Sequence, residues 1–345
     1  MIRADGPILC FGELLLRLSP PGHGPLFKDA RLDANFGGAE ANVAVALARL
    51  GRSSGVISAV PDDVVGDAAI DALRRSGVNV SRITRGDGRL GLYYLAPGAG
   101  LRASAIVYDR QDSVFATKAA TAYDWPALLA GAARLHLSGI NPAIGPAMAD
   151  ICLAAMTAAR ALGVPVSFDG NYRASMWAKW CADPAEILLP LVDRADLLFG
   201  NHRDIALLLR RPLDGSTSQG RRDAALAAFD RFPNLRHIAS MSREVRDAGC
   251  NVLRARIDTP TDVIETDAIE VSGIVDRIGT GDAFAAGVLA DLGEGGTEGT
   301  AEGAARAAQT GLALAVLKHA TPGDQSETTP RDLATFREGG FDVRR

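Results

Sequence analysis

The sequence carries no excess of positive charge. Its 345 residues include 37 Lys and Arg against 41 Asp and Glu, which gives a formal net charge of −4 at pH 7. Proteins that bind nucleic acid usually show a basic footprint, and proteins of the membrane surface a polybasic segment. We therefore expect neither nucleic acid nor a membrane as a partner.

Cysteine is scarce and long apolar runs are missing. Cys10, Cys152, Cys181 and Cys250 form no CxxC pair and match no zinc-site spacing, which indicates isolated thiols in a reducing compartment. No apolar run approaches the roughly 20 residues that span a bilayer. Glu13 and Arg17 interrupt the apolar patch near the N-terminus, so we expect no signal peptide and a cytoplasmic protein.

Several catalytic motifs are absent as well. The pattern GxxxxGK[ST] does not occur, which excludes a P-loop kinase, and no GxGxxG opens a βαβ unit, which argues against a dinucleotide enzyme. HExxH does not occur, and the five histidines are scattered. We therefore expect no metal that is bound directly by side chains.

What is present is an alternation of short apolar runs with Ala- and Leu-rich runs of helical spacing. The runs that predict strands are residues 8–11, 54–59, 134–138, 165–169, 197–200 and 236–240, and those that predict helices include 42–50, 67–76 and 146–162. This alternation favours βαβ units, and short continuous apolar runs are typical of parallel strands buried on both faces. The predicted fold class is α/β with a mostly parallel central sheet.

Two segments interrupt the alternation. Residues 14–36 are rich in Pro and Gly, and residues 89–115 look like two strands joined by a Pro/Gly turn. We predict that both form a small β lid on the α/β body; two separate surface hairpins are the alternative. No Ser/Gly linker divides the chain, so we expect a single domain over residues 1–345, with the Gly- and Glu-rich residues 293–303 as a loop.

The clearest chemical signal is IVDRIGTGDAFAAG, residues 274–287. Gly279, Thr280 and Gly281 precede an apolar run that predicts a helix with Asp282 at or near its start. The first amides of a helix lack internal partners and carry the positive end of the helix dipole, so they suit a phosphate. Asp282 can then accept the proton of a hydroxyl that attacks a phosphoryl group. The alternative role for Asp282 is that of a plain helix cap.

A second glycine motif is FGGAEANVAVALARLG, residues 36–51. Gly37 and Gly38 open a turn before a predicted helix, and Asn42 offers both a donor and an acceptor. The motif fits a site for substrate hydroxyls. A tight turn with small residues for packing is the alternative.

Together and in this order, the two glycine motifs resemble the two signatures of the PfkB/ribokinase family of carbohydrate kinases, and the resemblance covers nearly the whole chain. It implies a ribokinase-like, Rossmann-type three-layer body with a small β lid. It also implies ATP and Mg²⁺ as cofactors, Asp282 as the general base, and Gly279, Thr280 and Gly281 as an anion hole.

Within the family, GLYYLAPG, VYDR, LHLSGI and FDGNYRASMW resemble the 2-keto-3-deoxygluconate kinases. The resemblance implies phosphorylation of this sugar acid at its 6-hydroxyl. The implied substrate-binding residues are Gly38, Asn42, Tyr93, Tyr108, Arg110, Arg173 and Asp324. A carboxylate bound in a site that largely excludes water needs a nearby positive charge. The guanidinium group of Arg supplies this charge and can donate two parallel hydrogen bonds to the carboxylate. For each Arg, a surface salt bridge is the alternative.

For the nucleotide, the resemblance implies contacts on the far side of the Gly279–Asp282 turn, from Asn171, Tyr172, Asn201, Ser240 and Ser242. Asn201 and Asp204 stand where the family has N-x-x-E, so both are expected to order water around a Mg²⁺ ion held mainly by phosphates. Residues 240–251, SMSREVRDAGCN, depart from the Gly-rich strand-turn of the family. The departure leaves the ATP contacts in this segment open.

Several alternatives stay open from the sequence alone. A PfkB kinase for a neutral sugar or a nucleoside is the first, and a catalytically silent sugar-binding regulatory protein is the second, although the intact Asp282 turn argues against it. The sequence also leaves the epimer of the sugar acid open. Because an exposed lid edge favours strand pairing, we expect a homodimer formed through the lid.

Overall fold

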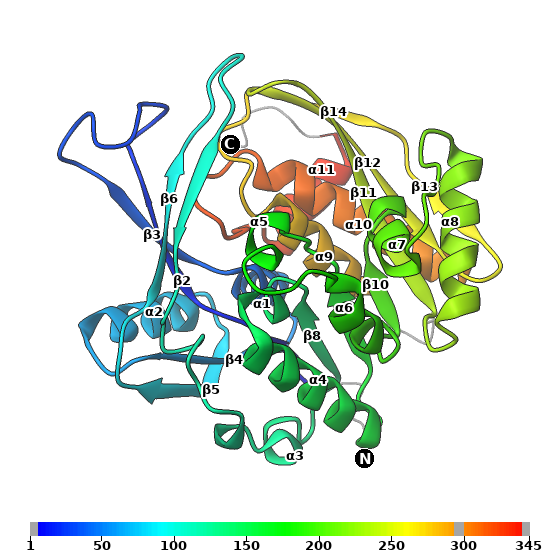
Figure 1. Cartoon of the computed structure of the whole chain (residues 1–345). Helices are drawn as coiled ribbons and strands as arrows, with labels where there is room; N and C mark the ends of the chain where they lie inside the picture. Colours follow the sequence, from blue (N-terminus) through cyan, green and yellow to red (C-terminus); the bar gives the residue numbers. More distant parts are fainter. Residues whose placement is uncertain (1–5, 293–299, 340–345) are drawn as a thin grey trace.

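A ten-stranded sheet forms the frame of the computed structural model, which describes residues 6–292 and 300–339 (Figure 1). The strand order is β13-β12-β11-β10-β9-β8-β1-β4-β5, and β14 also pairs with β12. The strands from β11 to β5 are parallel, whereas β12 to β14 add antiparallel pairs at one end. Their bounds are β1 Ile8–Phe11, β4 Ser54–Pro61, β5 Asn79–Gly86, β8 Arg134–Ser138, β9 Val166–Asp169, β10 Leu197–Phe199, β11 His237–Asp247, β12 Cys250–Asp258, β13 Val263–Glu265 and β14 Ile269–Ser272.

The predicted parallel sheet is confirmed, and β1 and β8 have the predicted bounds. In β1, Leu9 and Phe11 enter the apolar core on one face of the sheet while Cys10 enters the core on the other. This is why the strand reads as a continuous apolar run. The prediction for β11 was too short: the polar residues after position 240 continue the strand because β12 pairs with them antiparallel.

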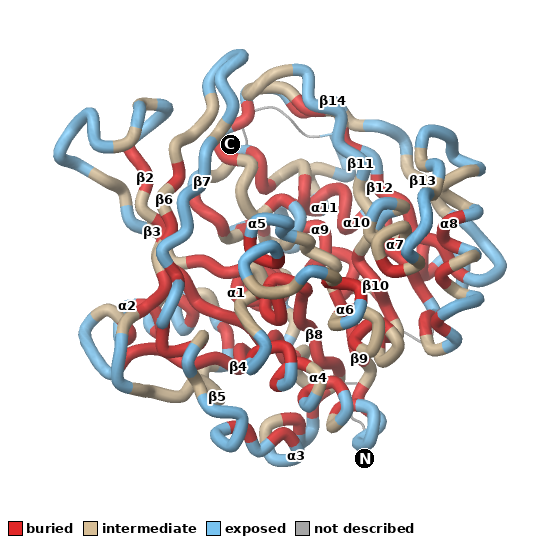
Figure 2. The backbone as a smooth tube through the Cα atoms, in the orientation of Figure 1, coloured by how far each residue is buried: buried red, intermediate tan, exposed pale blue. Residues whose placement is uncertain are grey.

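Helices cover both faces of the sheet and make a three-layer body. One core packs α1, α2, α9 and α10 against the sheet, and the other packs α3 to α8 (Figures 1 and 2). The bounds are α1 Ala39–Arg49, α2 Val64–Arg75, α3 Trp125–Leu128, α4 Pro146–Ala161, α5 Ala174–Trp177, α6 Pro184–Val192, α7 His202–Leu209, α8 Ser218–Arg231, α9 Thr280–Asp291, α10 Ala301–Lys318 and α11 Pro330–Arg337, with short 3₁₀ helices at Ala120–Ala122 and Pro142–Ile144.

The two irregular segments meet in one small sheet. Its strands are β2 Leu15–Ser19, β3 Asp33–Gly37, β6 Gly91–Ala96 and β7 Ala105–Asp109, in the order β3-β2-β6-β7. A parallel pairing of β2 with β6 joins the two hairpins. The two segments therefore form one sheet, as the prediction of a single β unit requires, and the alternative of two separate surface hairpins does not apply. Figure 1 shows this small sheet standing off the body, in blue and cyan.

Three helix starts differ from the sequence-based expectation. Helix α2 begins at Val64 instead of residue 67, because Asp63 is its N-cap and accepts hydrogen bonds from two amides of the first turn. Helix α1 begins at Ala39, three residues early, because Gly38 takes the N-cap position with φ 138°, a conformation that glycine tolerates. Helix α10 begins at Ala301 because the Thr300 side chain accepts a hydrogen bond from the Gly303 amide. The loop expected over 293–303 is therefore wrong for residues 301–303; residues 293–299 lie outside the described part.

In the described ranges, no helix has the length and apolar character needed to cross a membrane.

Candidate active site

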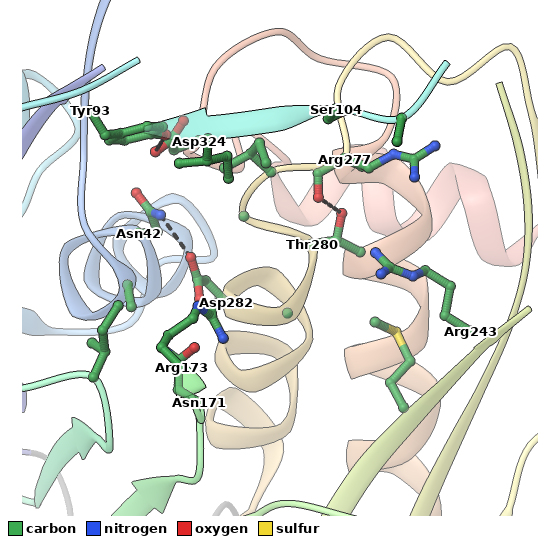
Figure 3. Close-up of a pocket in the computed structure, with 18 of the residues that line it drawn as sticks. Asn42, Tyr93, Ser104, Asn171, Arg173, Arg243, Arg277, Thr280, Asp282 and Asp324 are labelled. Carbon is green, nitrogen blue, oxygen red and sulfur yellow. Dashed lines mark hydrogen bonds between the residues drawn. The ribbon is translucent and has the colours of Figure 1, made fainter. Parts of the chain in front are cut away.

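A cavity of about 1000 Å³ lies where the carboxyl ends of the parallel strands meet the small sheet. Its wall combines residues from α1, β6 and β7, from the loops after β9 and β10, from β11, and from the turn that begins α9 (Figure 3). Ligands of open α/β sheets characteristically bind outside the carboxyl ends of the strands. The cavity is therefore the candidate active site.

The Gly279–Asp282 turn forms one wall of this cavity. Gly279 is the N-cap of α9 with φ 79°, and a Cβ there would lie 1.8 Å from the carbonyl oxygen of Asp324. Only glycine fits this position without moving the backbone. The Thr280 hydroxyl donates to the carbonyl oxygen of Arg277 at 2.7 Å, and Gly281 faces open space. The first amides of α9 are thus exposed toward a space where an anion can bind.

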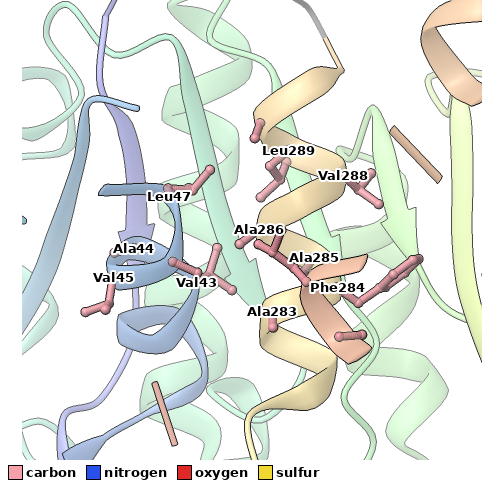
Figure 4. Close-up of a cluster of buried hydrophobic side chains, with 14 of the residues drawn as sticks. Val43, Ala44, Val45, Leu47, Ala283, Phe284, Ala285, Ala286, Val288 and Leu289 are labelled. Atoms are coloured by element: carbon pink, nitrogen blue, oxygen red, sulfur yellow. The ribbon is translucent and has the colours of Figure 1, made fainter. Parts of the chain in front are cut away.

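Asp282 is the third residue of α9 and makes no capping hydrogen bond. Its Oδ2 instead accepts a hydrogen bond from Nδ2 of Asn42 at 2.7 Å. Asn42 lies on α1, which packs beside α9 through Val43, Leu47, Ala283 and Ala286 (Figure 4). The packing of two helices from opposite ends of the chain therefore positions the carboxylate, and the alternative role as a plain cap does not apply.

Three carboxyl groups of the cavity wall have pKa values well above their usual range. Burial is the main cause that raises the pKa of Asp282, Asp169 and Glu40, each to about 7. Mutual repulsion adds to the effect, since Asp282 raises the pKa of Asp169 and Glu40 raises that of Asp282. The hydrogen bond from Asn42 and the charge of Arg173 lower the pKa of Asp282 in opposition. Groups poised near neutral pH suit general acid–base chemistry.

Buried ion pairs tie the small sheet to the body. Arg17 on β2 contacts Asp276 at 2.7 Å and Asp324 at 2.9 Å, and the Tyr93 hydroxyl on β6 donates to Oδ2 of Asp324. Asp276 also accepts a hydrogen bond at 3.0 Å from the amide of Ile278, just before the Gly279–Asp282 turn, which is called the anion turn below. Asp324 therefore lies at the cavity wall, yet it is already engaged with Tyr93 and Arg17.

The two arginines predicted to bind a carboxylate both line the cavity, and they differ in their partners. Arg110, directly after β7, is 8% exposed and pairs with Glu13 through Nε at 2.7 Å and also through Nη2, while its buried Nη1 has no partner among the described residues. Arg173 is exposed to the cavity and donates to the carbonyl oxygen of Tyr172 at 3.2 Å. Figure 3 shows Arg173 beside Asp282. Both guanidinium groups thus keep donors that a ligand can use.

Most of the residues predicted from the sequence come together at this cavity. Those that line it are Gly38, Asn42, Tyr93, Tyr108, Arg110, Asn171, Arg173, Asn201, Gly279, Thr280, Gly281, Asp282 and Asp324. Tyr172, Ser240, Ser242 and Asp204 do not line it. In β11, side chains alternate between faces, and Met241, Arg243 and Val245 point to the cavity, so Ser240 and Ser242 have the opposite parity.

Sequence reasoning missed nine charged residues of the wall: Glu13, Glu40, Arg102, Asp169, Arg203, Arg243, Arg246, Asp247 and Arg277. Asp169 ends β9, and its place at the carboxyl end of a predicted parallel strand was a usable signal. Across the described ranges, no cluster of three or more His, Cys, Asp or Glu side chains is arranged to hold a metal ion.

A comparison with known protein families identifies the chain. The model of the pfkB family carbohydrate kinases matches residues 7–329. The chain belongs to the PfkB family of carbohydrate kinases. It is therefore a carbohydrate kinase, and the resemblance found in the two glycine motifs is confirmed.

Several relatives and solved structures similar to this chain are named as kinases of keto-deoxy sugar acids. The chain is 33% identical over 337 residues to a 2-dehydro-3-deoxygalactonokinase of Haloferax volcanii, covering 96% of this chain and 97% of that one. It is 28% identical over 328 residues to the 2-dehydro-3-deoxygluconokinase of Bacillus subtilis, with 94% of each covered. The solved 2-dehydro-3-deoxygluconokinase of Thermotoga maritima superposes with a TM-score of 0.89 at 32% identity, over 98% of this chain and all of that one.

Proposed function

We propose that this PfkB kinase transfers the γ-phosphoryl group of ATP to the 6-hydroxyl of 2-keto-3-deoxygluconate. The observation that carries the proposal is the pairing, in one cavity, of Asp282 at the anion turn with guanidinium donors of Arg110 and Arg173 that no acidic side chain uses up. A neutral sugar offers these donors only uncharged oxygens, whereas the carboxylate of a sugar acid accepts charge-assisted hydrogen bonds from them. Relatives named for such acids support the same substrate class.

In the proposed reaction, Asp282 takes the proton of the 6-hydroxyl as the oxygen attacks the γ-phosphorus. The amides of Thr280 and Gly281 and the adjoining turn stabilise the charge that develops on the transferring group. Asn42 holds the Asp282 carboxylate toward the reacting oxygen, and Arg110 and Arg173 fix the other end of the sugar acid. The products are 2-keto-3-deoxy-6-phosphogluconate and ADP.

The small sheet supplies Tyr93, Tyr108 and Arg110 to the cavity, and we propose that it acts as a lid that excludes water from the phosphoryl group. A Mg²⁺ ion, when bound with the nucleotide, neutralises phosphate charge. Of the two residues expected to order water around such an ion, Asn201 lines the cavity, whereas Asp204 does not and its Oδ2 accepts from the amide of Asn201 at 2.8 Å.

The galactonate epimer, 2-keto-3-deoxygalactonate, is the second candidate substrate. The Haloferax volcanii relative is 33% identical along nearly the whole chain and is named for this epimer. A carboxylate and a terminal hydroxyl are common to both sugars, so the arginine and Asp282 arguments apply to both.

The test is a substrate panel with ATP and Mg²⁺: both keto-deoxy acids, fructose, ribose and adenosine. We expect turnover confined to the acids. Asp282→Asn should lower kcat by about 10²- to 10⁴-fold and leave binding of the acid intact, because only the proton acceptor is lost. The matched control is Asp223→Asn on the exposed side of α8. Turnover on a neutral sugar contradicts the acid-specific proposal, and full activity of Asp282→Asn contradicts the assignment of the base.

A further inference from the structure

A pair of arginines lies at the end of the cavity away from Asp282. Arg243 comes from the cavity face of β11, and Arg277 from the loop that leads into the anion turn. Figure 3 shows both side chains on the Thr280 side, while Asn42 and Asp282 lie on the other. The cavity is therefore divided into an acidic end, where the hydroxyl loses its proton, and a cationic end.

The charges of this pair are not balanced by an ion pair. Arg277 donates to the backbone carbonyl oxygens of Ala248 at 2.7 Å and of Asp247 at 3.4 Å. The side chain of Arg243 has no hydrogen bond or ion pair within the described ranges, while its backbone pairs with Leu253 of β12. Asp247 is the acid nearest in sequence on the cavity wall, and its Oδ1 accepts from the amide of Gly249 at 2.6 Å.

The environment of Arg243 is unfavourable for a cation without a counter-ion. Burial and the nearby charge of Arg277 both lower the pKa of Arg243. An anion between the two guanidinium groups would offset this repulsion and accept hydrogen bonds from both. Phosphate is suited to the position, because a guanidinium group can donate two parallel hydrogen bonds to its oxygens.

We propose that Arg243 and Arg277 bind the β-phosphate of the nucleoside triphosphate, the group next to the phosphoryl group that is transferred. The inference rests on the proposed function, which puts the transferring phosphoryl group at the Thr280–Gly281 amides. The adjoining β-phosphate can then lie between Arg277 and Arg243, on the Thr280 side of the cavity.

The pair then also has a chemical part in the transfer. As the new bond between the sugar oxygen and the γ-phosphorus forms, the bond from the γ-phosphorus to the bridging oxygen breaks. The electron pair of that bond stays on the diphosphate product, and the hydroxyl proton goes to Asp282. Two guanidinium groups at the diphosphate stabilise this developing charge.

The experiment compares Arg243→Gln with Arg254→Gln. Arg254 lies on β12 of the same ribbon, paired in register with Ser242, belongs like Arg243 to the exposed residues, and does not line the cavity, so it is a matched control. Titration calorimetry measures the affinity for ADP, AMP and a non-hydrolysable ATP analogue, and kinetics give the KM for the sugar acid.

For Arg243→Gln we expect the affinity for ADP and for the analogue to fall about 10- to 100-fold, from the loss of charge-assisted hydrogen bonds. AMP affinity and the KM for the acid should change much less, and Arg254→Gln should behave as the wild type. Thermal melting verifies that both variants fold.

Three results overturn the inference: ADP affinity that is unchanged in Arg243→Gln, an equal loss for AMP and ADP, or a rise in the KM for the acid with ADP binding intact. The last result would assign Arg243 to the sugar carboxylate. Failure of the proposed function looks different, because then no sugar acid is phosphorylated while ADP binding still depends on Arg243.

Discussion

At the scale of single residues, the main feature of the candidate active site is a group of carboxyl groups whose pKa values lie near 7. Glu40, Asp169 and Asp282 are far apart in sequence and converge at one end of the cavity, and burial raises each pKa to about 7. Because the three interact, their protons leave in steps that belong to the group as a whole. Asp282, the proposed base, is therefore only partly ionised at pH 7, and the hydrogen bond from Asn42 is one of the contacts that lower its pKa against the effect of burial.

This arrangement predicts a pH dependence. The proton acceptor must be ionised, so kcat/KM should rise as the pH increases through about 7 and then level off. The amide of Asn42 stabilises the ionised carboxylate and thereby lowers the pKa of Asp282. Asn42→Leu removes this donor, and the midpoint should move to higher pH by about one unit.

The measurement is the pH profile of kcat/KM for the sugar acid, and the position of the midpoint is compared rather than the height of the curve. Asn79→Leu, at an exposed position in β5, is the control and should keep the wild-type midpoint. A midpoint that stays in place in Asn42→Leu would mean that another group than Asp282 governs the profile.

Local motifs explain which of these residues could be predicted. The Gly279–Asp282 turn is contiguous, so its glycines and the following apolar run indicate a helix start with an acid beside it. The raised pKa of Asp169 could not be predicted, because it depends on Asp282 and Asp204, which are brought near it by different strands and helices. Arg243 was missed for a similar reason: strand parity decides which side chains face the cavity, and the strand was predicted to end before it.

At the scale of elements, the anion turn depends on how α9 is held. Helix α9 is buried along most of its length, between α1 and α10 (Figure 4). Gly287 of α9 faces Gly311 of α10, and a Cβ on Gly287 would lie 2.7 Å from the Cα of Gly311. The two backbones therefore approach more closely than any other residue pair would allow.

Gly287→Ala tests this contact. Alanine is favoured over glycine in a helix by about 1 kcal/mol, which by itself would stabilise the protein. The methyl group, however, meets backbone atoms that cannot rotate away, and such overpacking costs about 1–3 kcal/mol. We expect net destabilisation, seen as a lower midpoint of urea unfolding.

Gly24→Ala is the control, because a Cβ there meets no atom within 4 Å. Its unfolding midpoint should match that of the wild type. If Gly287→Ala were as stable as the wild type or more so, α9 and α10 would have room to separate, and the close approach would not be what holds the turn.

At the scale of the whole molecule, the parallel body was predictable and the joining of the small sheet was not. Short apolar runs that alternate with runs of helical spacing indicate βαβ units, because each strand of the parallel sheet is buried on both faces. The pairing of β2 with β6 links residues that are more than seventy positions apart, as in Leu16 with Leu92, and no local pattern encodes it. The sequence thus indicated where the strands of the small sheet lie, while its single four-stranded form required the structure.

The outer face of the small sheet leads to the last prediction. Strand β7 is an edge strand, exposed along its whole length, and Val107 on it is 58% exposed, in register with Tyr94 of β6. Phe27 lies in the connection between β2 and β3. It is 67% exposed, and its ring packs against the ring of Tyr94. An exposed edge strand with apolar neighbours favours pairing with another copy of the chain. We therefore expect a homodimer through the small sheet.

Light scattering after size exclusion tests the dimer, with a mass of about twice 36.1 kDa expected for the wild type. Val107→Glu places a charge in the interface and should give the monomer mass, because a desolvated charge without a partner opposes association. Val263→Glu is the matched control, since Val263 is 45% exposed on β13, an edge strand of the main sheet, and should leave the dimer intact. A monomeric wild type would contradict the prediction outright. A dimer that survives Val107→Glu and dissociates in Val263→Glu would move the interface to the opposite edge of the molecule, away from the strand that supplies Tyr108 and Arg110 to the cavity.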